Sequence, residues 1–418
     1  MGGLLFFEFL QITVGNRKSL SAAINDSDWL RLFDFCKKQA LIGVGFSAVE
    51  KLHAVGVVCP ANLRMQWMAL ALQIEKRNAV LNEQCKKLTE RYGHDGIATC
   101  ILKGQGNLLN YPEELRMRRQ CGDIDVWGAP LPPGGGYYNP DDKDMGIPIA
   151  VQTGKNEVDY VEYHGRKAVI EYVRMQHRLV GNEDRPVIRY HHIEAPKMKG
   201  TEVEVHFRPC YTHSPMRNWR MQRWFDAHAD VCMKNKTHMG FAVPTSSVNV
   251  VYQMCHLFSH YFDEGLGLRQ LMDYYFALRV WHNDVMECKD LQSQGMWSEG
   301  LGTPVMSKEE VMAVLRSFGM SKFTAAVMYV LQEVFAMPTL YYICEPNEKE
   351  GRKLMAEIMQ GGNFGQYDTR DAALKKGGMM KHGMWKLKRV MRLVSSYPEE
   401  ALWEPVFRVY HFIWRLCH

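Results

Sequence analysis

The chain has 418 residues, of which 46% are hydrophobic and 23% are charged, a composition typical of a globular protein with two or three domains. Its formal net charge is only +5, from 51 basic and 46 acidic residues. A dedicated nucleic-acid binder usually shows a concentrated basic face, so nucleic acid is a possible partner that the charge does not indicate.

The sequence also bears on the cellular compartment. The 11 cysteines are scattered and form no Cys-x-x-Cys pair, which is typical of reduced thiols in a cytoplasmic protein. The apolar start at residues 3–10 contains Glu8 and lacks the basic region and cleavage site of a signal peptide. No uninterrupted apolar run approaches the ~18 residues that span a bilayer. We therefore expect a soluble, cytoplasmic protein without a membrane span.

Residues 1–95 are expected to form an N-terminal helical region. Polar residues that can cap a helix precede an apolar pattern of helical spacing at residues 27–33. The longest predicted helix covers residues 61–92. Much of its apolar face is expected to consist of packed side chains, namely Met65, Met68, Leu72, Ile74, Val80 and Leu81.

Residues 101–127 carry the most informative pattern of the chain. A short apolar run leads into Lys103-Gly104-Gln105-Gly106, and a helix can begin between Gln105 and Tyr111. Glycines let the backbone approach a ligand closely, and the N-terminus of a helix can bind phosphate. The pattern therefore indicates a phosphate-binding turn after a strand.

Asp123 and Asp125 lie two residues apart in the next apolar strand pattern. Side chains at this spacing point to the same face of a strand, where two carboxylates repel each other. A hard divalent cation such as Mg²⁺ prefers oxygen ligands and would relieve that repulsion. An Asp-x-Asp pair alone is also common on solvated strand edges, but its position after a glycine turn favours phosphoryl or nucleotidyl transfer.

These motifs resemble those of a known family. The residues concerned are Leu102-Lys103-Gly104, Tyr111-Pro112, Arg116 and Gly122-Asp123-Ile124-Asp125-Val126. They resemble the signature of the uncharacterised nucleotidyltransferase family common in Bacteroides-type bacteria, part of the polymerase-β-like nucleotidyltransferase superfamily. The resemblance implies nucleotide-binding roles for Lys103, Gly104, Gln105 and Arg116, although Gln105 stands where the superfamily usually has serine. It also implies a third carboxylate on a later strand.

Residues 128–148 are rich in proline, glycine and aspartate, which predicts a loop or inserted excursion beside the aspartate pair. A helix is expected over residues 156–175. The alternating pattern at residues 187–209 then predicts a hairpin that turns near residues 196–200.

The predicted hairpin contains two candidates for the third carboxylate. Glu204 lies between valines, and Glu204-Val205-His206-Phe207 resembles the family's acidic-apolar-His-aromatic strand. Glu202 shares the face of Glu204 by strand alternation and is the rival candidate. The resemblance favours Glu204.

The remainder of the chain, from about residue 216, has a helical pattern. His256 and His260 share a helical face and could bind zinc, but without an evident third ligand a structural role is favoured. Arg269 and Asp273 are expected to pair or to contact the nucleotide domain. The basic stretch at 375–392 is interpreted as a solvated helix face, with an anionic partner as the alternative.

We therefore predict an α+β fold with a small mixed-sheet nucleotidyltransferase core at residues 96–212, between helical regions at 1–95 and 213–418. The resemblance implies that Asp123, Asp125 and Glu204 hold Mg²⁺, or Mn²⁺. The enzyme would transfer a nucleoside monophosphate from a nucleoside triphosphate to an unidentified hydroxyl acceptor and release pyrophosphate. The alternative is an inactive nucleotide-binding or interaction protein on the same fold.

Overall fold

The computed structural model describes residues 2–131, 146–152, 158–181, 186–293, 305–370, 374 and 378–417. These residues are mostly helical and include one small mixed four-stranded sheet, which confirms the α+β class. None of the helices described has both the length and the apolar character needed to cross a bilayer.

The chain divides into two compact units that interleave along the sequence. The helical unit contains Met1–Ala79, Leu108–Cys121 and Gln253–Leu402. The sheet unit contains Val80–Asn107, Gly122–Tyr252 and Trp403–His418. Each unit consists of three segments that are separate in the sequence. Each of the three domains predicted from the sequence, in contrast, is one continuous segment.

In the helical unit, α1 (Gly2–Val14) packs against α3 (Ile42–Ala54) and α11 (Ser321–Phe335), and α11 packs against α12 (Glu348–Gly361). Helix α2 begins where predicted within a residue or two, because Asn25 and Asp28 form a reciprocal capping box. The helices and short 3₁₀ turns that lie wholly in this unit are α1 (Gly2–Val14), α2 (Asp26–Lys38), α3 (Ile42–Ala54), α5 (Glu113–Arg116), α9 (Leu268–Ser293), α10 (Lys308–Ser317), α11 (Ser321–Phe335), η2 (Thr339–Tyr341), α12 (Glu348–Gly361), η3 (Asn363–Gly365) and α14 (Met379–Leu393). Three further helices have residues in both units, namely α4 (Ala61–His94), α8 (Ser246–Asp263) and α15 (Pro398–Cys417).

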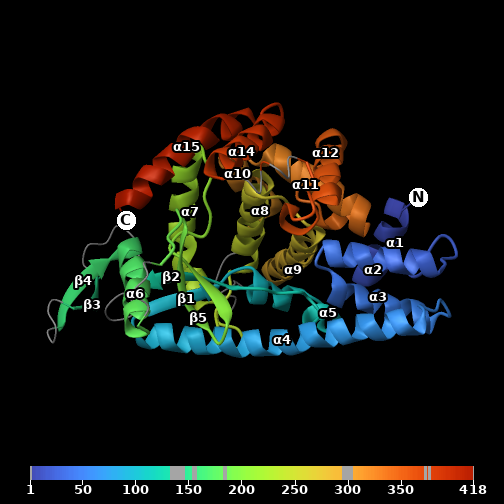
Figure 1. Cartoon of the computed structure of the whole chain (residues 1–418), viewed down its shortest axis with the longest axis horizontal. Helices are drawn as coiled ribbons and strands as arrows, with labels where there is room; N and C mark the ends of the chain where they lie inside the picture. The colour runs from blue at the N-terminus through green and yellow to red at the C-terminus, as the bar shows by residue number, and fades with distance from the viewer. Residues whose placement is uncertain are drawn as a thin grey trace. The chain divides into compact units, whose positions relative to one another are not determined.

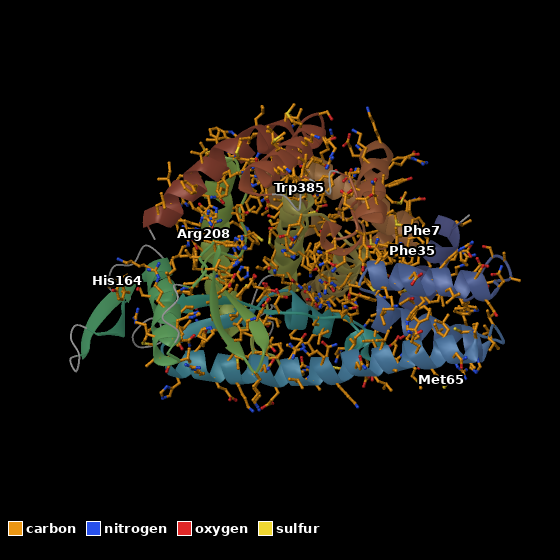
Figure 2. All side chains as sticks on the ribbon, viewed as in Figure 1. Phe7, Phe35, Met65, His164, Arg208 and Trp385 are labelled. Atoms are coloured by element: carbon orange, nitrogen blue, oxygen red, sulfur yellow. The ribbon has the colours of Figure 1, made fainter. Side chains whose placement is uncertain are left out.

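Helix α4 matches the long helix expected from the sequence, but its predicted packing face is largely wrong (Figure 1). The buried side chains include Leu63, Trp67 and Leu81, whereas Met65 is 56% exposed (Figure 2). Met68, Leu72 and Val80 are also exposed. The helix carries apolar residues on more than one side, so hydrophobicity alone did not identify the side that packs.

The sheet unit contains the mixed sheet, in the strand order β1 (Ile97–Ile101), β2 (Ile124–Pro130), β6 (Thr201–His206) and β5 (His192–Met198). The central pair β2–β6 is parallel, and the two outer pairs are antiparallel. Helix α6 (Gly165–Leu179) covers one face, where a Cβ on Gly128 would lie 3.3 Å from Val169 (Figure 1). Helix α7 (Pro215–Lys234) also belongs to this unit.

The region after β2 differs from the prediction. Residues 128–130 complete β2, residues 146–148 begin β3 (Gly146–Gln152), and residues 132–145 lie outside the described part of the chain. The helix predicted from residue 156 begins only at Gly165, because Val158–His164 forms β4, which pairs with β3. The valines and tyrosines of β4 favour a strand, and Gly165, with φ of +51°, allows the abrupt change to a helix.

The predicted hairpin is confirmed as β5 and β6. Its turn is narrower than expected, because Pro196 remains within β5 and the chain reverses at Lys199 and Gly200, both with positive φ. A proline is tolerated there since β5 is an edge strand of the sheet.

The basic stretch predicted at residues 375–392 corresponds mainly to α14, and residues 375–377 lie outside the described part. Arg389 of this helix is buried and donates to the backbone oxygens of Phe262 and Tyr261, at 2.9 and 2.6 Å. At least this member of the stretch therefore stabilises the helical unit.

Candidate functional site

The parallel pairing of β2 with β6 determines which carboxylates meet. Asp125 lies opposite Glu204, and Trp127 lies opposite His206. Register partners on neighbouring strands point to the same face of a sheet, so Asp125, Glu204 and His206 share one face. The intervening Val126 and Val205 are fully buried on the other face.

Asp125 is at the centre of this group and is only 3% exposed. Its Oδ1 atom accepts from Lys103 Nζ at 2.8 Å and from His206 Nε2 at 3.0 Å. Burial alone would raise the pKa of Asp125, but the Lys103 charge and the His206 hydrogen bond hold it below its usual value. Burial opposes the charge of Lys103, yet Asp125, Asp123 and Glu204 together raise the pKa of this lysine.

Glu204 is the carboxylate that the structure places beside Asp125. Its Oε2 atom lies 3.7 Å from His206 Nε2 and 3.5 Å from His192 Nδ1. Burial would raise the pKa of Glu204, but His206 and Lys103 lower it to about 2. The rival Glu202 has a side chain that is 70% exposed and pairs with Lys197 at 3.0 Å.

Asp123 directly precedes β2 and differs electrostatically from Asp125. The negative charge of Asp125 and burial together raise the pKa of Asp123. Within the described residues, no side chain forms an ion pair or hydrogen bond with the Asp123 carboxylate. The repulsion expected between two neighbouring aspartates is therefore only partly offset in this structure.

The glycine turn lies beside the aspartates but has a different shape from the one expected. Gly104 has φ of +48°, and a Cβ on it would lie 3.6 Å from Asp123 O. The segment Gly104–Asn110 is a 3₁₀ helix rather than the start of an α-helix. Gly106 packs against β1, since a Cβ there would lie 2.4 Å from Ile101 O.

The four residues expected to bind the nucleotide have different surroundings. Lys103 faces the carboxylates, and Gly104 forms the turn described above. Gln105 is buried and donates to Asn82 Oδ1 of α4 at 2.6 Å. Arg116 belongs to the helical unit, where it donates to Tyr111 O at 3.5 Å. Their roles in nucleotide binding remain predictions.

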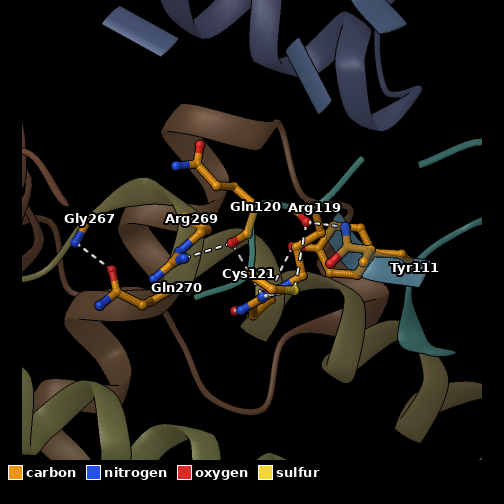
Figure 3. Close-up of polar contacts among 9 residues, drawn as sticks. Tyr111, Arg119, Gln120, Cys121, Gly267, Arg269 and Gln270 are labelled. Carbon is orange, nitrogen blue, oxygen red and sulfur yellow. Dashed lines mark hydrogen bonds and ion pairs between the residues drawn. The ribbon is translucent and has the colours of Figure 1, made fainter. Parts of the chain in front are cut away.

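The segment 108–121 is held to α9 by polar contacts within the helical unit. Asp273 accepts hydrogen bonds from Arg119 Nε and from the Tyr111 hydroxyl, both at 2.6 Å. Arg269 donates to Gln120 O at 2.6 Å (Figure 3). Arg269 and Asp273 therefore both contact this segment, which was assigned from sequence to the central domain.

Two histidine groups differ in their metal-binding potential. The ring centroids of His256 and His260 lie 4.2 Å apart in an edge-to-face arrangement, and His260 Nδ1 lies 3.5 Å from Glu264 Oε2. Among the described residues, they belong to no group of three potential ligands. In contrast, the ligand atoms of Asp125, Glu204 and His206 all lie within 4.8 Å of one another. His206 was part of a recognised motif, but its contact with Asp125 depends on the β2–β6 pairing.

The chain was compared with known proteins. No curated protein and no solved structure matches it. One family pattern, described as uncharacterised nucleotidyltransferase, matches residues 25–130 and 160–295, more than half of the chain. The matched stretches include Asp123, Asp125 and Glu204. The chain therefore belongs to this family of uncharacterised nucleotidyltransferases.

Proposed function

We propose that the protein is a Mg²⁺-dependent nucleotidyltransferase that transfers a nucleoside monophosphate from a nucleoside triphosphate to a hydroxyl acceptor. Membership of the family supports nucleotidyl transfer in general. One observation carries the proposed site: Asp125 and Glu204 are register partners on parallel strands, next to an Asp123 carboxylate without a side-chain partner.

The residues present fit a hard divalent cation. Three carboxylates face one lysine ammonium and one histidine whose pKa is raised despite its burial by hydrogen bonds to Asp125 and Glu204. Even with both of these groups charged, one negative charge is left uncompensated. Asp123, Asp125 and Glu204 would hold Mg²⁺, or Mn²⁺, which would offset the charge that develops on the transferring phosphoryl group and on pyrophosphate.

The protein's own groups would position the reactants and accept a proton. The acceptor oxygen forms a bond to the α-phosphorus, the bond between the α-phosphorus and the bridging oxygen breaks, and pyrophosphate leaves. The hydroxyl proton passes to Asp125 or Glu204, both of which are ionised at neutral pH because their pKa values are lowered. Lys103 would contribute positive charge to the triphosphate, consistent with its place beside these carboxylates.

A specific contact favours the alternative, an inactive nucleotide-binding protein. The Lys103 ammonium, 2.8 Å from Asp125, already neutralises a carboxylate that the enzyme would use for the cation. In a chain that had lost catalysis, this ion pair would stabilise the sheet without any metal. The two functions differ in whether nucleotide binding requires Mg²⁺ and Asp123.

Thermal unfolding with each nucleoside triphosphate tests both functions. Ligand at 100 times its dissociation constant stabilises a protein by roughly 2.7 kcal/mol, which is readily measured. If the protein is the proposed enzyme, we expect a nucleoside triphosphate to raise the melting temperature only when Mg²⁺ is present. This increase should disappear in Asp123→Asn and remain in Glu202→Gln, the matched control on β6. A shift that persists with chelator and in Asp123→Asn favours the inactive protein, and no shift with any nucleotide contradicts both.

The nucleotide that binds would then be used to measure pyrophosphate release with mixtures of hydroxyl acceptors. We expect Asp125→Asn to lower the rate of pyrophosphate release by about 10³-fold and Glu202→Gln to leave it unchanged. Asp125 is one of the proposed cation ligands, whereas Glu202 is not. A near-normal rate in Asp125→Asn would contradict the proposed site.

A further inference from the structure

Three histidines gather on the sheet next to Glu204. His192 on β5 is the register partner of His206 on β6, and His191 directly precedes β5. The ring centroid of His191 lies 4.4 Å from that of His192 and 5.2 Å from that of His206. One nitrogen from each ring can be chosen such that all three lie within 4.8 Å of one another.

The contacts of this histidine cluster have the spacing of ligands around a tetrahedral ion. His191 Nε2 lies 3.0 Å from His192 Nδ1, and Glu204 Oε2 lies 3.5 Å from His192 Nδ1 and 3.7 Å from His206 Nε2. Zinc–nitrogen bonds of about 2.0–2.1 Å in a tetrahedron separate the ligand atoms by roughly 3.3 Å. The measured separations bracket this value.

Each ring contributes one nitrogen to this cluster, and its second nitrogen lies outside it. The second nitrogen of each ring, Nδ1 of His191, Nε2 of His192 and Nδ1 of His206, is buried without a hydrogen-bond partner among the described residues. A histidine that binds a metal through one ring nitrogen usually donates from the other to a carboxylate, a carbonyl or water, so the nitrogens within the cluster are the ones available to an ion.

We propose that His191, His192 and His206, with Glu204, bind a transition-metal ion of the Zn²⁺ class. Imidazole suits such an ion, whereas Mg²⁺ takes oxygen ligands, so this site differs chemically from the proposed magnesium site, with which it shares Glu204. When His206 Nε2 binds the ion, its proton passes to solvent and its hydrogen bond to Asp125 is lost. Asp125 then remains paired with Lys103, 2.8 Å away, so the charge of Asp125 is still compensated. The proposal does not rest on nucleotidyl transfer.

Cobalt substitution tests the site without any measurement of activity. The chain is treated with a chelator, titrated with Co²⁺ and examined for the intense visible absorption of tetrahedral Co²⁺, and Zn²⁺ is then added as a competitor. We expect one equivalent of Co²⁺ to bind and Zn²⁺ to displace it. Asp123→Asn should retain the band, because Asp123 is not among the proposed ligands. So should His177→Ala, a matched control in α6 whose Nε2 atom lies 2.9 Å from Glu194 O.

Loss of a ligand should weaken Co²⁺ binding by at least tenfold in His191→Ala and His192→Ala. His192→Gln preserves most of the side-chain volume and should show the same loss, and circular dichroism without metal verifies that each variant is folded. Absence of the band in the wild type overturns the proposal. So does a band that is undiminished in the folded His191 and His192 variants, or one that disappears in Asp123→Asn.

Discussion

Lys103 Nζ lies 2.8 Å from Asp125 Oδ1, and the Asp125 side chain is only 2% exposed. Lys103 follows β1 and Asp125 lies in β2, so the pair joins the glycine turn to the acidic strand. A divalent cation bound to Asp125 would compete with this ammonium for the carboxylate. We therefore expect the ion pair to influence the stability of the sheet unit and, if a cation binds Asp125, the affinity for that cation.

Lys103→Met should lower the free energy of unfolding by roughly 3 kcal/mol in the absence of divalent ions, because the buried Asp125 loses its lysine partner and keeps only the contact with His206. Mg²⁺ should then stabilise the variant more than the wild type, since no ammonium competes. Urea unfolding with Mg²⁺ or with chelator measures both effects. Lys197→Met, which removes the partner of the exposed Glu202, is the control and should change little. Equal stabilisation of both proteins by Mg²⁺ would contradict competition.

Arg119 and Asp273 form a second buried pair, with side chains only 4% and 5% exposed. Arg119→Met should lower the free energy of unfolding by roughly 3–5 kcal/mol, because the buried Asp273 carboxylate loses its main partner. Chemical denaturation measures the change. The double variant Arg119→Met/Asp273→Leu should be more stable than Arg119→Met alone, since it removes the unpaired charge. Similar stabilities of the single and double variants would show that the charge of Asp273 is not responsible.

Local patterns were sufficient to predict several elements of the sheet unit. The apolar pattern around Asp125 predicted a strand, and β2 (Ile124–Pro130) contains Asp125, whereas Asp123 directly precedes it. The alternation around Glu204 predicted the β5–β6 hairpin. Both features arise from residues close together in the chain, where strand alternation directly determines which side chains share a face.

Contacts between distant segments could not be predicted in this way. Arg119 and Asp273 are separated by 154 residues, and nothing near either one indicates its partner. His192 and His206 meet because of the register of β5 and β6, and Asp125 meets His206 because β2 and β6 pair in parallel. Hydrophobicity also failed to identify the buried side of α4, where Trp67 packs and Met65 is exposed.

Substitution by alanine should affect stability differently at Gly106 and at Gly122, two glycines near Asp123. Gly106→Ala places a Cβ 2.4 Å from Ile101 O, so the turn or β1 must shift, at a cost of roughly 1–3 kcal/mol. Gly122→Ala meets nothing within 4 Å and should alter stability by less than about 0.5 kcal/mol. Chemical denaturation of the two variants provides the comparison. Equal stabilities would show that Gly106 is not constrained by β1.

The ion pairs of Arg370 should make the stability of the helical unit depend on pH in the acidic range. Its guanidinium binds Glu357 through two hydrogen bonds of 2.7 and 2.6 Å and also binds Asp368. Burial raises the pKa values of both carboxyl groups, but Arg370 reverses the effect and holds them below their usual values of 4.5 and 3.8. Because the folded-state pKa values are lowered, this stabilisation is complete above the unfolded-state values. It is lost as the pH falls from about 4.5 through the folded-state values.

Arg370→Met should therefore be less stable than the wild type by roughly 2 kcal/mol at pH 6, and the difference should shrink towards pH 3. Urea unfolding at a series of pH values measures the two profiles. Arg352→Met is the control, because Arg352 binds the exposed Glu348 on the same helix, and its profile should follow that of the wild type. A difference between Arg370→Met and wild type that stays constant down to pH 3 would show that Glu357 and Asp368 do not carry the effect. The packing of the arginine side chain would then be the source of its contribution.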